Sequence, residues 1–296
     1  MNTPLFGANV DPGVGSLETG FAIAELADST GLDLVMIQDH PYNKDHLDTW
    51  TLLAAIAART ERVHVGTNVA NIPLRTPAML AKMAASLDVI SGGRVELGLG
   101  AGIFWRGIVA YGGREDLQDK PFTAFEEALA IIRGMWANTG RGFKFEGELY
   151  RVSGAIPGPA PVHDIRIWVG GSGPKMLRLI GEQADGITVS TPYVPYRELA
   201  RFNEQIDAAA QAAGRSPEAV RRMYNLMGTI TGREVRDGFE GKNYAGTPQQ
   251  WIDHLAMLVR EYRQDTFVFW PVEGDPVEQM ETFATTIAPA VKDAVG

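Results

Sequence analysis

The chain has 296 residues, a length that suits two average domains or one (β/α) barrel with a short insertion. Hydrophobic residues make up 45% and charged residues 21%, which excludes fibrous and disordered classes. The formal net charge is −9 and no long Lys/Arg cluster occurs, so nucleic acid is not an expected partner. The absence of cysteine excludes disulfides, thiolate catalysis and Cys-ligated metals.

No membrane partner is expected either, because no run of about 18 apolar residues occurs. The first residues, MNTPLFGANVDPG, lack the basic region and the apolar run of a signal peptide. These features predict a cytoplasmic protein.

Short β-branched runs alternate with longer segments of helical periodicity along the chain. Strands are predicted at residues 5–10, 34–38, 63–69, 95–99, 165–169, 187–190, 222–230 and 266–270. Helices are predicted at residues 17–29, 50–58, 77–91, 122–136, 175–184, 196–213, 247–263 and 277–295. A stretch rich in Gly and Pro, residues 139–163, interrupts the alternation and predicts a short hairpin followed by a loop.

Eight βα units favour an α/β fold in which a parallel sheet closes into a (β/α)8 TIM barrel. We expect one barrel domain over residues 1–296, with the excursion at 139–163 between the fourth and fifth strands. The alternative, an open doubly wound sheet, typically carries G-x-G-x-x-G after its first strand. Here the first strand is followed by NVDPGVGS, which does not fit.

The functional residues of a (β/α) barrel lie at the C-terminal ends of its strands. Two neighbouring ends, at residues 98–102 and 170–173, are rich in glycine. Glycine lets a backbone approach a ligand closely, and the second loop leads into a helix N-terminus, which favours a phosphate. The two loops together predict a cradle for a phosphorylated cofactor. The alternative is that each is a tight βα turn.

The pair Asp39-His40 ends the second predicted strand. Histidine is easily poised near neutral pH, so His40 is the candidate catalytic residue, and a structural hydrogen bond is the alternative role. The other histidines are expected away from the strand ends: at the start of the third strand, in a loop, in the excursion and in a helix (His64, His46, His163 and His254). No metal site is therefore predicted.

Hydrolytic chemistry also finds no support, because no convincing carboxylate pair and no G-x-S-x-G motif occur at the strand ends. Glycine loops with few acid–base groups indicate that a bound cofactor carries the chemistry.

Three stretches resemble a known family: LDLVMIQDH (32–40), RVHVGTNVANIPLRTPAMLAKMAASLDVISGGRVELGLGAG (62–102) and IRIWVGGSGPKMLRLIGEQADGITVS (165–190). The family is that of the luciferase-like flavin/deazaflavin oxidoreductases, and the resemblance covers nearly the whole chain. The middle stretch is the most specific because it keeps a long ordered pattern. The resemblance implies a (β/α)8 barrel. Since large insertions are missing, the chain is similar to the branch that uses the deazaflavin coenzyme F420.

The resemblance also implies roles for individual residues. Asp39 and His40 match a pair beside the isoalloxazine or deazaflavin ring, and Asn68-Val69 match a non-prolyl cis peptide behind that ring. Ser190 matches a position near the substrate or phosphate. The loops that hold the ring edge and the ribityl phosphate are matched by Ala101, Gly102, Gly170, Gly171, Ser172 and Gly173.

The chain departs from the sugar-phosphate dehydrogenases of the family. Ile103 stands where they carry a catalytic Glu, and Tyr193 where they carry a phosphate-binding Lys. Their Trp after the Asp-His pair is missing, unless Tyr42 or Trp105 replaces it. Sugar-phosphate oxidation is therefore not expected. An apolar substrate pocket is predicted from nearby aromatic residues, although Trp270 fits core packing equally well (Phe104, Trp105, Tyr193 and Trp270).

These features predict hydride transfer between reduced F420 and a hydrophobic organic substrate, with His40 polarising or protonating the acceptor. A first alternative is a monooxygenase that receives reduced FMN from a separate reductase. A second is a barrel that binds a ligand without catalysis. Three basic residues are candidates for a rim that binds the F420 tail, Arg75, Arg106 and Lys175. The resemblance further implies a homodimer formed through barrel helices.

Overall fold

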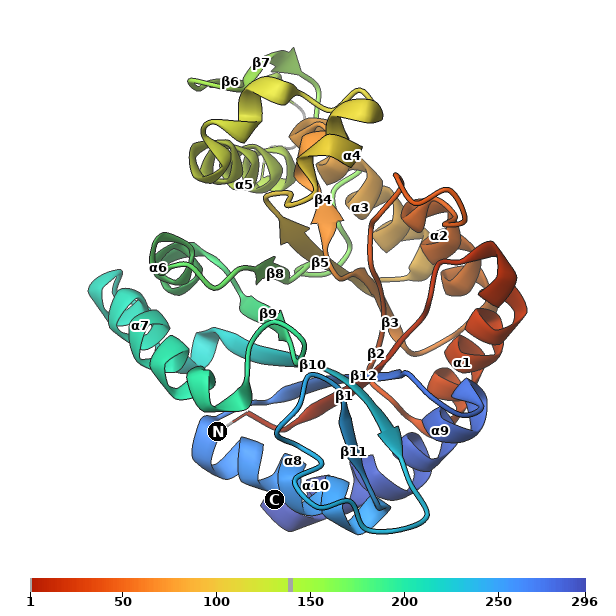
Figure 1. Ribbon diagram of the computed structural model, residues 1–296. Coiled ribbons are helices and arrows are strands. Elements are labelled where there is room, and N and C mark those ends of the chain that lie inside the picture. The colour runs from red at the N-terminus through yellow and green to blue at the C-terminus, as the bar shows by residue number, and fades with distance from the viewer. Residues whose placement is uncertain (1, 138–140) are drawn as a thin grey trace.

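A computed structural model describes residues 2–137 and 141–296 (Figure 1). Residues 139 and 140 of the predicted excursion lie outside the described residues. The strands are β1 Leu5–Asn9, β2 Leu34–Ile37, β3 His64–Thr67, β4 Ala70–Asn71, β5 Val95–Gly100, β6 Phe143–Glu146, β7 Arg151–Ala155, β8 Ile167–Gly170, β9 Gly186–Ser190, β10 Arg221–Ile230, β11 Tyr244–Gly246 and β12 Thr266–Pro271. The α-helices are α1 Leu17–Thr30, α2 Thr49–Arg59, α3 Pro77–Ser91, α4 Trp105–Ala110, α5 Pro121–Ala137, α6 Pro174–Gln183, α7 Leu199–Ala212, α8 Pro248–Tyr262, α9 Pro276–Thr282 and α10 Ala288–Val295.

Eight parallel strands form the barrel, in the order β1-β2-β3-β5-β8-β9-β10-β12, and β12 pairs with β1 to close the ring. The predicted (β/α)8 barrel is therefore confirmed. The main core lies between the strands and the surrounding helices, and a smaller buried cluster forms a separate core (Leu34, Met36, Trp168, Met223 and Val268). None of the helices in the described part of the chain has the length and hydropathy that a bilayer crossing needs.

Glycine allows close contact between β3 and β5. A Cβ atom on Gly98 would lie 2.1 Å from the carbonyl oxygen of Thr67, so no other residue fits there. The Thr67 hydroxyl donates a hydrogen bond of 2.7 Å to the Gly98 carbonyl. The chain then turns through Asn68 and Val69 into the short strand β4, which pairs with β5. This bulge at the C-terminal end of β3 forms part of the barrel mouth.

The described part of the excursion contains the predicted hairpin, formed by the antiparallel pair β6 and β7. Figure 1 shows it next to α5 and apart from the barrel strands. Its turn is held by one carboxylate of α5: Glu127 accepts hydrogen bonds from the backbone N–H groups of Glu148 (2.6 Å), Leu149 (3.0 Å) and Tyr150 (2.8 Å).

Several short elements differ from the predictions. The two-residue strand β4 and the three-residue strand β11 were not expected, because two or three residues show no clear periodicity. Helix α4 lies where no helix was predicted. The predicted helix 277–295 is divided by a π-helical turn, Phe283–Ile287, between α9 and α10.

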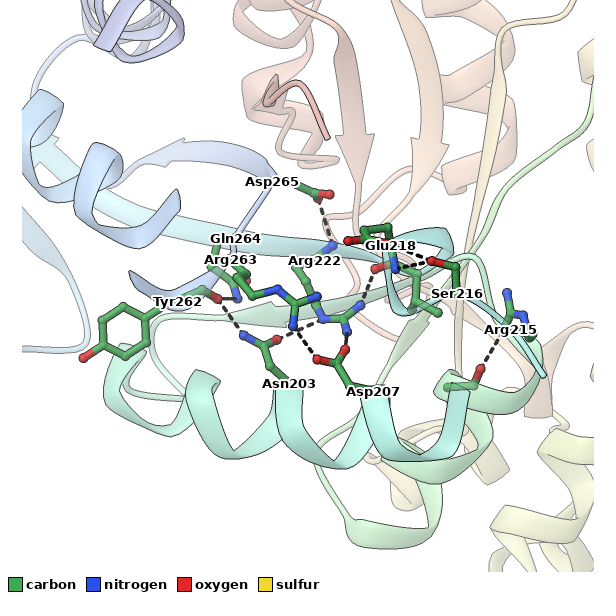
Figure 2. Close-up of polar contacts among 12 residues, drawn as sticks. Asn203, Asp207, Arg215, Ser216, Glu218, Arg222, Tyr262, Arg263, Gln264 and Asp265 are labelled. Carbon is green, nitrogen blue, oxygen red and sulfur yellow. Dashed lines mark hydrogen bonds and ion pairs between the residues drawn. The ribbon is translucent and has the colours of Figure 1, made fainter. Parts of the chain in front are cut away.

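A network of polar side chains joins α7, β10 and the end of α8 at the N-terminal side of the barrel (Figure 2). The guanidinium of Arg222 is buried and donates hydrogen bonds to Asn203 Oδ1 (2.9 Å) and Asp207 Oδ1 (2.8 Å). Arg263 pairs with the other oxygen of Asp207. Burial lowers the pKa of Arg222 to about 10, and the neighbouring carboxylates partly offset this effect. One carboxylate thus bridges two cations.

Candidate active site

A cavity of about 450 Å³ opens at the C-terminal end of the barrel. Strands β2, β3, β5, β8, β9 and β10 or the loops after them contribute to its lining. All ten predicted cofactor-binding residues line it: Asp39, His40, Asn68, Val69, Ala101, Gly102, Gly170, Gly171, Ser172 and Gly173. Ser190 and Tyr193 line it as well. The fold therefore brings together residues that are more than 130 positions apart in the sequence, which a closed barrel makes possible.

Asp39 is buried and binds Arg75 through both carboxylate oxygens. Arg75 Nε donates to Oδ2 (2.8 Å) and Arg75 Nη2 donates to Oδ1 (2.9 Å). Asp48, the N-cap of α2, accepts a further hydrogen bond from Arg75 Nη2 at 2.6 Å. Although burial disfavours its charge, the hydrogen bonds from Arg75 to both carboxylates raise the pKa of Arg75. The suggestion that Arg75 forms a basic rim for a cofactor tail is thus corrected, since two carboxylates already hold its guanidinium.

His40 pairs with Tyr42 at the edge of the cavity. The distance from His40 Nδ1 to the Tyr42 hydroxyl is 2.7 Å, a normal hydrogen-bond length. Burial lowers the pKa of His40, and the nearby charge of Asp39 partly opposes this effect. Burial and Asp39 both raise the pKa of Tyr42. The pair is therefore neutral at pH 7, an imidazole next to a phenol.

The peptide bond between Asn68 and Val69 is cis, as the resemblance implies. The Asn68 side chain is held from across the barrel. Its Nδ2 donates to Asn225 Oδ1 (2.7 Å), and its Oδ1 accepts a hydrogen bond from the Thr188 hydroxyl (3.0 Å). Asn225 Nδ2 also donates to Ser190 Oγ (3.1 Å). The orientation of the bulge thus depends on β9 and β10.

The glycines of the two loops differ in whether the backbone requires glycine at that position. Gly102 has a φ of +85°, which residues with a side chain rarely adopt. A Cβ atom on Gly100 would lie 2.6 Å from Val69 Cγ2. Gly173 has neither reason: its φ is −75°, and a Cβ there would have no atom within 4 Å. Gly173 precedes Pro174 at the start of α6 and lines the cavity. Space next to Gly173 is therefore open to a ligand at a helix N-terminus.

One buried polar group in the cavity lining has no partner among the described residues. The side chain of Asn71 is 6% exposed, and its Oδ1 accepts no hydrogen bond. A buried acceptor without a partner is costly, so this atom is suited to an N–H or O–H group of a ligand. Asn71, Thr188 and Asn225 were not singled out from the sequence. The signal of Asn71 is a buried acceptor without a partner among the described residues, and that of Thr188 and Asn225 is hydrogen bonding to Asn68 across the barrel.

The outer part of the mouth is apolar and exposed. Ile103 and Tyr193 line the cavity with exposed fractions of 87% and 83%. Phe104 packs edge-on against Tyr42 with ring centroids 5.1 Å apart. Trp105, expected near the substrate, is not among the described residues that line this cavity, since it begins α4 and packs against the core. Trp270 lines a separate cavity of about 170 Å³.

Comparisons with known proteins place the chain in a family. The family model of luciferase-like monooxygenases matches residues 4–234. The chain belongs to this family. The luciferase-like barrel is 36% identical over 197 residues to a 5,10-methylenetetrahydromethanopterin reductase of Methanolobus tindarius, a match that covers 67% of this chain and 57% of the relative. The chain thus spans less than two thirds of that relative.

Two further similarities concern proteins whose names include coenzyme F420. An F420-dependent glucose-6-phosphate dehydrogenase of Nocardia farcinica is 30% identical over 233 residues, with 72% of this chain and 69% of the relative covered. The structure of a coenzyme F420-dependent tetrahydromethanopterin reductase from Methanopyrus kandleri superposes with a TM-score of 0.84 at 20% identity. That superposition covers 97% of this chain and 99% of the other, and it supports the fold.

Proposed function

We propose that this luciferase-like barrel, as a single domain of residues 1–296, is an oxidoreductase that binds coenzyme F420 and transfers a hydride between it and a hydrophobic organic substrate. The observation that carries the proposal is the composition of the cavity. It combines the Asn68-Val69 bulge, the Asp39-His40 pair and an open glycine loop at the N-terminus of α6. The names of two relatives, which include F420, support the choice of cofactor.

The residues present fit such a cofactor. Gly173 leaves space for a phosphate at a helix N-terminus, and Asn71 Oδ1 is a buried acceptor without a partner among the described residues. The Asn68-Val69 bulge would support the ring. Arg106 and Lys175, which are both exposed, remain as candidates for the rim that binds the anionic tail. When bound in its reduced form, the cofactor supplies a hydride.

In this proposal His40 supplies the proton. We assign the Tyr42 hydroxyl as the donor to Nδ1 of the neutral imidazole, which places the remaining proton of His40 on Nε2. Since His40 lines the cavity, Nε2–H can donate to the oxygen of an acceptor and stabilise the negative charge that develops there. The buried Asp39, which Arg75 binds through both carboxylate oxygens, also accepts a hydrogen bond from the backbone N–H of Asn71 (3.0 Å).

The apolar mouth supports a hydrophobic substrate. Ile103, Tyr193 and Phe104 expose apolar surface next to the cavity, and exposed apolar groups at a pocket are typical of binding sites. The replacement of a Glu and a Lys by Ile103 and Tyr193 removes the charges that a sugar phosphate would require. Oxidation of sugar phosphates is therefore not part of the proposal.

Anaerobic fluorescence titration tests the cofactor assignment. We expect F420 to bind with a Kd in the micromolar range or below, and FMN to bind at least about tenfold more weakly. Strong binding of reduced FMN with weak F420 binding would instead favour the monooxygenase alternative, which the family description also suits. In that case a separate reductase would be the expected partner. If neither cofactor binds, a ligand-binding barrel without catalysis becomes the better explanation.

We also propose a homodimer that uses α3. Three apolar side chains of this helix are exposed, Met79 (54%), Val89 (43%) and Ile90 (71%). A second copy would bury them. Sedimentation of the protein at micromolar concentration would give the mass of two chains if this is correct, and of one chain if it is not. A location in the cytoplasm stays a prediction.

A further inference from the structure

The N-terminal end of the barrel, opposite the cavity, contains a cluster of possible metal ligands. His64 begins β3, Glu96 lies in β5, and His163 lies in the segment that returns from the hairpin to β8. In the sequence these three residues belong to separate segments. The fold brings one ring nitrogen of each histidine and a carboxylate oxygen to within 4.8 Å of one another.

Glu96 is the centre of the cluster. Its side chain is fully buried, and its Oε1 lies 3.2 Å from His64 Nδ1. The indole Nε1–H of Trp168 donates a hydrogen bond of 2.8 Å to the other oxygen, Oε2. Trp168 therefore fixes the plane of the carboxylate. Outer hydrogen bonds of this kind orient the ligands of most metal sites.

The two ring nitrogens of His163 have different surroundings. Both are shielded from solvent and neither makes a hydrogen bond to a described residue, although Nδ1 lies 2.6 Å from Asp88 Oδ1. Its ring is 5.7 Å from that of His64 and almost perpendicular to it. A carboxylate beside Nδ1 leaves Nε2 as the natural ligand atom, since ligating histidines usually have a carboxylate or carbonyl at the second nitrogen.

We propose that His64, Glu96 and His163 bind one divalent transition-metal ion of the Zn²⁺ class. Two imidazoles and one carboxylate are ligands that Zn²⁺ accepts, with water in the fourth position. Metal–ligand distances of about 2.1 Å separate the ligand atoms of a tetrahedral site by about 3.4 Å. His64 Nδ1 and Glu96 Oε1 are 3.2 Å apart, close to this spacing, and the three ligand atoms all lie within 4.8 Å of one another.

The position of the site indicates a structural role. The ion would connect β3 and β5 to the segment before β8, so the end of the excursion would be fixed to the barrel. It lies at the barrel end that is remote from the cavity, where stability and not catalysis is the usual function. This inference does not depend on the proposed activity.

Arg166 competes with the metal for the same oxygen. Its Nη1 donates to Glu96 Oε1 at 2.9 Å, and its side chain is 44% exposed. It can therefore move into solvent when a cation binds. A cavity of about 280 Å³, lined in part by His64, Glu96 and Arg166, provides the access route. Replacement of Arg166 by a neutral residue should strengthen metal binding.

Calorimetric titration with Zn²⁺ tests the inference on the full chain, free of any affinity tag and treated with a chelator. We expect one equivalent to bind with a micromolar Kd. His64→Ala and His163→Ala should each weaken binding at least tenfold, and Arg166→Gln should strengthen it severalfold. Both histidines are partly exposed, so these variants should fold; if Glu96→Gln does not fold, they still decide the question. Zn²⁺ at a hundredfold excess over Kd should raise the Tm by about 5 °C.

His46→Ala is the matched control, because His46 lies in a loop away from the cluster and its loss should leave Zn²⁺ binding unchanged. Absence of binding at 100 µM Zn²⁺ would overturn the inference. So would binding that persists in both histidine variants, or an affinity that Arg166→Gln does not raise. In these cases the cluster is only an ion-pair network around Glu96.

Discussion

At the scale of single residues, Tyr42 distinguishes the two ring nitrogens of His40. With the phenol gone in Tyr42→Phe, no described side chain bonds Nδ1, and both neutral tautomers become populated. We expect kcat to fall about twofold with little change in KM, because a donor to the transition state is lost in part of the molecules. The tautomer can be read directly from ¹⁵N shifts of the labelled imidazole, without a substrate.

Tyr111→Phe is the control for this change, because Tyr111 is exposed at the end of α4 and is not among the described residues that line the cavity. Its imidazole spectrum and kcat should equal those of the parent protein. An unchanged His40 spectrum in Tyr42→Phe would contradict the role of the phenol.

A substitution at Gly173 tests whether the loop after β8 is a ligand cradle or a simple turn. In Gly173→Ala the new methyl group meets no protein atom within 4 Å, and the backbone angles suit alanine. We expect the free energy of unfolding to fall by less than about 1 kcal/mol, since alanine caps a helix less well than glycine. Cofactor affinity should fall about tenfold, because the methyl group occupies space used by the ligand. Urea unfolding and fluorescence titration measure the two effects.

The control variant Gly112→Ala should show the opposite behaviour: lower stability and unchanged cofactor affinity. Gly112 has a φ of +79°, so alanine there strains the backbone, by about 1 kcal/mol, and it does not line the cavity. If Gly173→Ala binds the cofactor as tightly as the parent, the loop after β8 is a turn and nothing more.

At the scale of elements, the pairing of α7 with β10 depends on Asp207. In Asp207→Ala the buried guanidinium of Arg222 keeps its bond to Asn203 but loses its charged partner. Removal of one member of a buried ion pair costs about 3 kcal/mol, so we expect a loss of that size in chemical denaturation. The exposed Asp253 of α8 offers the control: Asp253→Ala should change stability by about 0.5 kcal/mol at most.

At the scale of the whole molecule, His254 makes stability depend on pH. It stacks on Phe239 with ring centroids 4.3 Å apart, and burial lowers its pKa to about 4. In the unfolded chain His254 has a pKa of about 6.5 and binds the proton more strongly. The stability that comes from burying the neutral ring is therefore present above pH 6.5 and is lost as the pH falls toward 4. Between pH 7 and pH 5 the loss is about 2 kcal/mol.

The measurement is urea unfolding at both pH values. His254→Phe keeps an aromatic ring on Phe239 and removes the titrating group, so its stability should depend less on pH by this amount. Equal pH dependence in the variant and the parent would show that His254 is not the responsible group.

The sequence predicted the architecture well because each βα unit carries its own local pattern. Strand and helix periodicities are visible within about ten residues, and closure follows from their number. The Asp39-His40 pair and the glycine loops were found because their positions follow strand ends. By contrast, Arg75 was one of three candidates for a cofactor rim, because only the fold shows that Asp39 and Asp48 bind it.

Contacts across the barrel could not be predicted from one sequence. Asn68 and Asn225 are 157 positions apart, and neither shows a local signal of their hydrogen bond. The gathering of His64, Glu96 and His163 is a similar case. Such contacts depend on strand order and register, which hydrophobic periodicity does not specify.

The attachment of the β6–β7 hairpin has a consequence for how this chain tolerates change in length. One carboxylate, that of Glu127, receives the backbone N–H groups of the turn, while the two strands pair only with each other within the described residues. Phe143, Phe145 and Val152 of these strands also pack against the core, so a replacement hairpin must keep these apolar contacts. A longer or shorter pair of strands could be grafted onto α5 without remaking the barrel, provided that a turn with three free N–H groups still meets this one acceptor.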